Sequence, residues 1–194
     1  MEALNLLKKY GDNGYIGEEV TQMQHAYQCS ILAEDYCRVA AQEDTTTFNN
    51  DFILGCLFHD IGHLLCFEDP SIEKMSDYGV MNHETVGANY LRSLGYNENV
   101  CEFAENHINT KRYLISTDST YYTNLSEASK QTYEFQGGKL SETEIQKFKQ
   151  NKLFKYHLKL REFDDKAKST EPLLLKKIVK MEADLYYSKF ILSM

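Results

Sequence analysis

Proline is scarce in this sequence, and several patterns that mark particular protein classes are missing. Only two of the 194 residues are proline and 42% are hydrophobic, so neither a disordered chain nor a fibrous repeat is expected. No apolar run reaches the roughly 18 residues that a membrane-spanning helix needs. Residues 1–4 also lack the basic start of a secretory signal. We therefore expect no membrane association and a cytoplasmic location.

An excess of basic residues is missing as well. The chain has 21 Lys and Arg against 29 Asp and Glu, a formal net charge of −8. This balance argues against a nucleic-acid partner, for which a basic stripe is typical. An anionic small substrate stays open, because one pocket can be positive on an acidic protein. There is no Cys-x-x-Cys pair, and the five cysteines lie mostly in apolar stretches, which indicates buried free thiols in a reducing compartment.

Strand-like alternation of apolar and polar residues never extends beyond about five residues, whereas helical periodicity recurs along the chain. We therefore predict an all-α protein with a single domain over residues 1–194 and about seven or eight helices. Residues 42–50 and 112–124 are expected to be loops, and Asn50 or Asp51 is expected to cap the helix after the first loop. The predicted helices cover residues 2–10, a long segment from about 15–25 to 41, 52–66, 79–94, 97–109, 125–133, a segment from 141, 151–168 and 173–194.

The segment 52–66 is almost entirely apolar but carries His59, Asp60 and His63 at its centre. Burying an unpaired charge is costly, and a metal ion or a tight hydrogen-bond network is the usual relief. On a continuous helix His59 and His63 would share a face, with Asp60 about 100° round from His59. The adjacent His59 and Asp60 can then bind one metal together, and the carboxylate can also reach a second.

Four further ligand-type residues lie near the apolar faces of other predicted helices. A single histidine in such a place is usually an ordinary core or surface residue, but several helices that each present one inward ligand are typical of metal sites in helical bundles. Mixed histidine and carboxylate sets favour Fe, Mn or Zn over Ca or Mg. These candidate ligands are His25, His83, His107 and Asp164.

The order His25, His59-Asp60 and Asp164 resembles the HD-domain superfamily, and His83 and His107 resemble the additional ligands of its dinuclear members. The finer resemblance is to the mixed-valence di-iron oxygenases that cleave hydroxylated phosphonates, a family that includes the 2-amino-1-hydroxyethylphosphonate dioxygenases. It implies a single HD-domain bundle with a metal-site core over about 15–168 and a closing helix over 173–194. The motifs that carry the resemblance are Tyr15-Ile-Gly-Glu18, His59-Asp-Ile-Gly-His63, His107 with Lys111, and residues 125–132, 136–138 and 161–165.

This resemblance implies two irons, an Fe(II)/Fe(III) pair, with O2 as co-substrate. One iron would take His25, His59, Asp60 and Asp164, and the other would take His83 and His107, with Asp60 bridging the two. The substrate would be a small anionic organophosphonate of the 1-hydroxy-2-aminoethylphosphonate type. Cleavage of its C–P bond would give inorganic phosphate and a carboxylate, glycine or glycine betaine. No obligate protein partner is implied.

The resemblance also assigns substrate-binding residues. The phosphonate would be held by His63, Lys111, Ser129, Thr132 and Arg161, although Ser129 could instead serve only in helix capping. Tyr15 and Glu18 would form a lid, with Tyr15 near an iron until substrate arrives and Glu18 facing the substrate's amino group. Asp60, Tyr15, Glu18 and His63 are thus the candidate catalytic residues. A trimethylammonium tail would instead need aromatic faces, with candidates Tyr113, Tyr121, Tyr122 and Tyr133.

Three alternatives use the same residues differently. An HD-type phosphohydrolase acting on a phosphate monoester or a nucleotide would use a metal-bound hydroxide and consume no O2. An inositol oxygenase would have no phosphonate for Lys111 and Arg161 to meet. A ligand-binding or regulatory HD module would have no activity, which the complete set of six ligands argues against.

Overall fold

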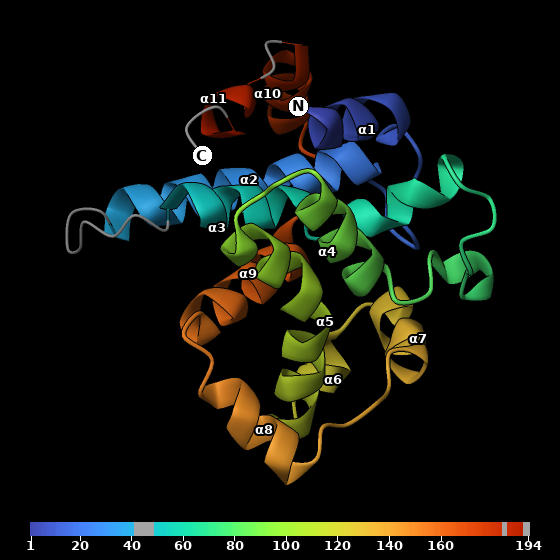
Figure 1. The fold of residues 1–194 in the computed structure, drawn as a ribbon, viewed down its shortest axis with the longest axis vertical. Coiled ribbons are helices and arrows are strands. Elements are labelled where there is room, and N and C mark those ends of the chain that lie inside the picture. Colours follow the sequence, from blue (N-terminus) through green and yellow to red (C-terminus); the bar gives the residue numbers. More distant parts are fainter. Residues whose placement is uncertain (41–48, 184–185, 192–194) are drawn as a thin grey trace.

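The structure is a computed structural model that describes residues 1–40, 49–183 and 186–191 (Figure 1). Over these residues the chain is all-α, as predicted, with eleven α-helices and two short 3-10 helices rather than seven or eight helices. None of the described helices has the length and apolarity that crossing a bilayer requires. The elements are α1 Glu2–Tyr10, α2 Gln22–Ala40, α3 Asn49–Phe58, η1 Ile61–Phe67, η2 Ser76–Tyr78, α4 His83–Ser93, α5 Glu98–Thr117, α6 Tyr121–Asn124, α7 Glu127–Phe135, α8 Glu142–Lys149, α9 Phe154–Lys166, α10 Pro172–Ala183 and α11 Ser188–Ile191.

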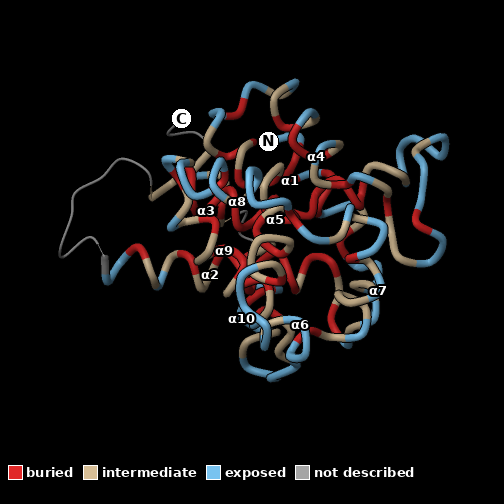
Figure 2. Tube along the Cα trace, turned by 90° about the horizontal axis from the view of Figure 1, so that it is seen from below, coloured by how far each residue is buried: buried red, intermediate tan, exposed pale blue. Residues whose placement is uncertain are grey.

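Helix α3 is the centre of the core. Every residue from Asp51 to Phe58 is buried, as expected for a helix that is apolar on all sides. It packs against α2, α5 and α9, and the Phe52 ring meets the edges of Phe103 and Tyr156. Figure 1 shows α2 and α3 side by side across the molecule, and in Figure 2 the buried parts of the chain run through its middle. The core therefore surrounds the segment that leads into His59 and Asp60.

The predicted continuous helix over 52–66 is wrong, because α3 ends at Phe58 and a turn at His59 and Asp60 leads into the 3-10 helix η1. Just after this break, the backbone of η1 closely approaches that of α4. A Cβ atom on Gly62 would lie 2.0 Å from the carbonyl oxygen of His83, so η1 packs directly on the start of α4. As a result His59 and His63 do not share a helix face: the His59 ring lies beside His25, and the His63 ring stacks on His83.

Two other predicted boundaries are also wrong. Helix α5 continues through Thr117, so the expected loop over 112–124 is helical at its start and contains α6 as well. Ile115 is buried in a small cluster with Leu125 and Tyr133, which favours a continued helix here, and the hydroxyls of Ser116 and Thr117 donate to carbonyls one turn back. The expected closing helix over 173–194 is divided into α10 and α11, and 184–185 and 192–194 lie outside the described residues.

The predicted helix starts gave mixed results. Ser126 accepts from the backbone N–H of Ser129, and Ser141 with Glu144 forms a capping box, which confirms the predicted starts of α7 and α8. Asn50 and Asp51 lie inside α3 rather than before it, and the Asp51 carboxylate accepts from two asparagine side chains at the start of α5. Most of the expected 42–50 loop falls outside the described residues.

The close contact between η1 and α4 predicts that Gly62→Ala destabilises the protein. The new methyl group would meet the His83 carbonyl oxygen and also the Gly87 backbone nitrogen, at 2.9 Å, so α4 would have to shift. Overpacking of this kind costs about 1–3 kcal/mol. We expect a lower midpoint in denaturant unfolding. Gly14→Ala is the matched control, because nothing lies within 4 Å of its Cβ position. Equal midpoints for the two variants would contradict the proposed contact.

Candidate metal centre

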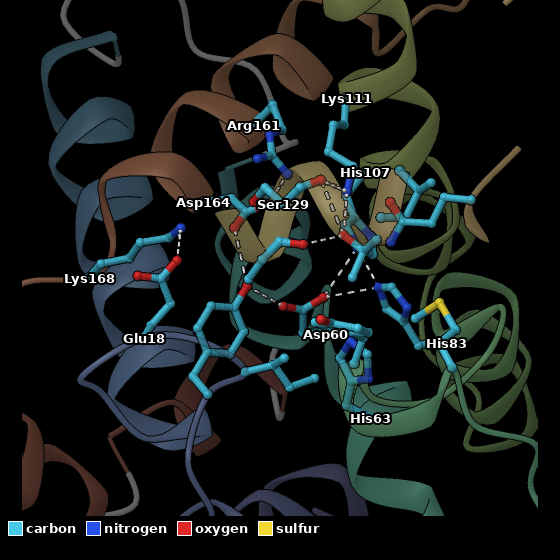
Figure 3. A pocket seen from close by; sticks show the side chains of 18 residues that line it. Glu18, Asp60, His63, His83, His107, Lys111, Ser129, Arg161, Asp164 and Lys168 are labelled. Carbon is cyan, nitrogen blue, oxygen red and sulfur yellow. Dashed lines mark hydrogen bonds and ion pairs between the residues drawn. The ribbon is translucent and has the colours of Figure 1, made fainter. Parts of the chain in front are cut away.

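Asp60 lies between two pairs of histidine side chains, of which Figure 3 shows the pair His83 and His107. Its Oδ2 atom is 3.3 Å from Nε2 of His59 and 3.7 Å from Nε2 of His25. Its Oδ1 atom is 3.4 Å from Nε2 of His83 and 3.2 Å from Nε2 of His107. The two oxygens of one carboxylate thus face two different pairs of ring nitrogens.

Asp164 completes the first group. Its Oδ1 atom is 3.4 Å from Nε2 of His25 and 3.9 Å from Nε2 of His59, and these two nitrogens are 3.3 Å apart. The group joins α2, the end of α3 and α9. In the second group, Nε2 of His83 and Nε2 of His107 are 3.0 Å apart, at the start of α4 and within α5. The structure therefore brings all six predicted ligands into one buried cluster.

Three of these rings are oriented by backbone carbonyls. The Nδ1 atoms of His25, His59 and His107 lie 2.7–2.9 Å from the carbonyl oxygens of Ala167, Cys56 and Ala104. A carbonyl only accepts, so each Nδ1 carries a proton, and Nε2, which points into the cluster, has a free lone pair whenever the ring is neutral. Lone pairs at such short separations repel one another unless a cation lies between them.

The charges of the cluster also favour a cation. Burial alone would raise the pKa of Asp60, but the charge of His59 and hydrogen bonds with His107, His59 and His83 hold it well below its ordinary range. Burial opposes charging of His59, yet Asp60 raises the pKa of this imidazole to about 9. The Arg161 guanidinium holds the pKa of Asp164 well below its ordinary range despite burial. Two anionic carboxylates therefore face the histidine nitrogens and attract positive charge.

The donor atoms fit metal ions. Metal–nitrogen and metal–oxygen bonds of about 2.0–2.2 Å place neighbouring ligand atoms about 2.8–3.6 Å apart, and most of the distances in both groups lie in this range. Mixed imidazole and carboxylate sets suit transition metals. Cys29 was not predicted as a ligand, although its Sγ atom is 3.7 Å from Nε2 of His25. Burial raises the pKa of its thiol well above the ordinary value, so without a bound metal Cys29 is a neutral thiol.

A small cavity of about 60 Å³ lies beside Asp60, and Lys111 lines it together with Ser129 and Thr132 (Figure 3). Nζ of the buried Lys111 donates to Oγ1 of Thr132, at 3.1 Å, and to the Ser129 carbonyl, at 3.4 Å. Burial, with a further contribution from the Arg161 charge, lowers the pKa of Lys111 to about 7. The Ser129 hydroxyl accepts from Ser126, so its observed contact belongs to the cap of α7.

Arg161 also lines this cavity, but each of its nitrogens already has a protein partner. Nη1 donates to Asp164 at 2.7 Å, Nε donates to the Tyr121 hydroxyl at 2.7 Å, and Nη2 donates to Asp165. Sequence reasoning identified Arg161 and Asp164 but missed the roles of Tyr121 and Asp165. The i, i+4 spacing of Arg161 and Asp165 was a signal for their pair, whereas no local signal pointed to Tyr121.

His63 contributes a neutral ring to the same cavity. It stacks on His83 with a centroid distance of 3.9 Å, and its Nδ1 atom accepts from the backbone N–H of Val80 at 3.1 Å. Burial and the neighbouring His83 lower the pKa of His63 well below its ordinary value. Its proton therefore resides on Nε2, which makes this atom a hydrogen-bond donor.

Tyr15 covers the first ligand group. Its ring stacks on His25 at 3.9 Å, and its hydroxyl lies 3.0 Å from Oδ2 of Asp60 and 3.5 Å from Oδ1 of Asp164. Burial and these two carboxylates raise the pKa of Tyr15 well above its ordinary value, so the hydroxyl stays protonated and donates. Glu18, three residues later, forms an ion pair with Lys168, a residue that sequence reasoning missed because it lies 150 positions away.

Comparisons with known proteins extend these observations. The family described as the HD domain matches residues 23–186. The uncharacterised protein L432 of Acanthamoeba polyphaga mimivirus is 38% identical over 85% of this chain and 70% of its own length. The hydroxymethylphosphonate dioxygenase of Gimesia maris is 36% identical over 84% of this chain and 75% of its own. The [1-hydroxy-2-(trimethylamino)ethyl]phosphonate dioxygenase (glycine-betaine-forming) of Leisingera caerulea is 29% identical over 86% and 78%.

The shared position of Asp60 predicts that Asp60→Asn weakens metal binding by both groups and loses at least one metal ion. The substitution keeps the shape of the side chain but removes the negative charge that each histidine pair faces. After loading with iron and desalting, elemental analysis should find at least one metal ion fewer per chain than in the unmodified protein. Asp77→Asn, which changes an exposed carboxylate of η2, should leave the metal content unchanged. Two ions retained by Asp60→Asn would refute the bridging role.

Proposed function

The chain belongs to the HD-domain family, and we propose that it is a di-iron oxygenase that uses O2 to break the C–P bond of a 1-hydroxyphosphonate. The observation that carries this proposal is the two-sided arrangement at Asp60, next to a cavity that contains a buried lysine. One group would consist of His25, His59, Asp60 and Asp164, and the other of His83, His107 and Asp60. Two relatives named as phosphonate dioxygenases, each similar over most of this chain, support the same reaction class.

The proposed reaction balances without a further reductant. A 1-hydroxyphosphonate dianion and O2 would give a carboxylate, hydrogen phosphate and one proton. The C–P bond and the C–H bond at the hydroxyl-bearing carbon break, that carbon is oxidised, and both atoms of O2 enter the products. Bound iron would supply the activation of O2 and Lewis-acid polarisation of the substrate hydroxyl. Without a bound metal, the imidazoles and carboxylates of the cluster can neither activate O2 nor act as a Lewis acid.

The chain's own residues would bind and orient the substrate. The phosphonate has oxygens that need donors, and Lys111 and Thr132 present a charged and a hydroxyl donor on one side of the cavity. His63 would add an N–H donor on the side of the second ligand group. Arg161 would contribute less directly to phosphonate binding than the sequence suggested, because its guanidinium also donates to Asp164 and holds it in place. Tyr15, which covers the first group, would have to move for a substrate oxygen to approach it.

The reaction can be tested with the iron-loaded protein under ascorbate, supplied with hydroxymethylphosphonate or 2-amino-1-hydroxyethylphosphonate. We expect O2 uptake and phosphate release in equal amounts with at least one of them, and neither in Asp60→Asn. Methyl phosphate is the control substrate, because it offers a monoester of similar size and no C–P bond. Phosphate release from methyl phosphate without O2 uptake would instead establish the phosphohydrolase alternative. The small cavity already favours a compact substrate over a nucleotide.

The lowered pKa of Lys111 predicts a pH dependence. Lysine is cationic below its pKa and neutral above it, so kcat/KM for the phosphonate should fall as the pH rises through about 7. In Lys111→Arg the guanidinium stays protonated over this range, so that variant should lose the pH dependence while keeping substrate binding. Steady-state kinetics across this range measures both profiles. The same decline in both proteins would show that another group titrates.

A further inference from the structure

Glu18 and Lys168 form an ion pair at one end of the cavity (Figure 3). Oε1 of Glu18 is 2.5 Å from Nζ of Lys168, and both side chains are largely enclosed. The same Nζ atom is 3.4 Å from Oγ of Ser126, at the start of α7. The pair thus joins the loop before α2, the segment after α9 and α7, on the side of the cavity away from His83 and His107.

A carboxylate in a substrate cavity would ordinarily favour a cationic substrate, and sequence reasoning assigned that role to Glu18. In the structure, the ammonium group of Lys168 already pairs with this carboxylate. A substrate ammonium at Glu18 would therefore have to displace Lys168 or lie beside it, and like charges side by side in a partly desolvated site repel strongly.

The backbone at Gly17 and Glu18 is held in place by two contacts. The backbone N–H of Glu18 donates to the Tyr15 carbonyl at 3.0 Å, which holds Glu18 in a turn. Gly17, with φ +73°, packs against α7 so closely that a Cβ would lie 2.7 Å from Cβ of Ala128. Only Gly adopts this conformation readily and also permits this approach. The loop that carries Glu18 is therefore held against α7.

A trimethylammonium tail would need aromatic faces, and the cavity offers few. Among its described lining residues only Tyr15 and Tyr78 are aromatic apart from the histidines, and Tyr15 already stacks on His25. The tyrosines considered from the sequence do not line the cavity. Tyr113 packs on Phe148 and Phe154, Tyr121 bonds Arg161 and Asp165, and Tyr122 and Tyr133 pack on each other.

We propose that Lys168 is a specificity-determining residue that acts as an internal counter-ion for Glu18 and excludes substrates with an amine or trimethylammonium tail. On the proposed function, on which this inference rests, the preferred substrate is a 1-hydroxyphosphonate with hydrogen or a small uncharged group on the hydroxyl-bearing carbon. Hydroxymethylphosphonate is the smallest member of that class. The charge of Lys168, rather than the identity of the metal ligands, sets this preference.

The test compares two ligands in matched variants by calorimetric titration of the metal-loaded protein without O2. The ligands are hydroxymethylphosphonate and 2-amino-1-hydroxyethylphosphonate, and the measured quantity is the ratio of their dissociation constants. The unmodified protein should bind the ligand without the amine more tightly. Lys168→Met should shift the ratio towards the amine by about tenfold or more, because Glu18 then lacks a counter-ion. Lys168→Gln, which keeps a polar side chain, should shift the ratio in the same direction.

Two controls separate specificity from a purely structural role. Lys130→Met removes a lysine of α7 that pairs with Glu127 outside the cavity, and it should leave the ratio unchanged. Adding Glu18→Gln to Lys168→Met should abolish the gain for the amine. The proposal is overturned if Lys168→Met weakens the binding of both ligands equally, as the loss of a purely structural contact would. It is also overturned if the unmodified protein binds the amine-bearing ligand more tightly. Failure of the proposed function would appear separately, as binding without O2 uptake or phosphate release.

Discussion

The structure depends on one carboxylate that faces two ways. Each oxygen of the Asp60 side chain lies against a different pair of histidine nitrogens, and the pairs come from α2 and the end of α3 on one side and from α4 and α5 on the other. Such a cluster is unfavourable in a buried site unless cations balance it. The apolar surroundings of α3 and the close packing of η1 on α4 hold these groups together against that repulsion.

The same balance of charge extends outward from Asp60. Asp164 has Arg161 as its partner, Arg161 is held in turn by Tyr121 and Asp165, and Glu18 has Lys168. Lys111 differs, because its ammonium is bound by a hydroxyl and a carbonyl rather than by a carboxylate. It is the cation of the cavity that is best placed to meet an anionic ligand. Around the metal centre, charge pairing therefore distinguishes residues that support the site from the residue that would bind substrate.

That the six side chains lie together could be predicted from the sequence, because the order of residue types along the chain resembles a known pattern and several helices each carry one such residue. The break after Phe58 could not, because apolar residues continue through η1 and the packing of η1 on α4 is visible only in the folded chain. Likewise, Glu18 was identified but its pairing with Lys168 was not, since the two meet only in the folded chain. Local patterns therefore identified the residues of the cluster, whereas tertiary contacts determined the surroundings of the cavity beside it.

The most direct test of the shared carboxylate is a crystal structure of the iron-loaded protein with anomalous diffraction recorded at the iron absorption edge. We expect two iron peaks, one beside His25, His59 and Asp164 and the other beside His83 and His107, each bound by a different oxygen of Asp60. A single peak, or two peaks of which one has no bond to Asp60, would contradict the account.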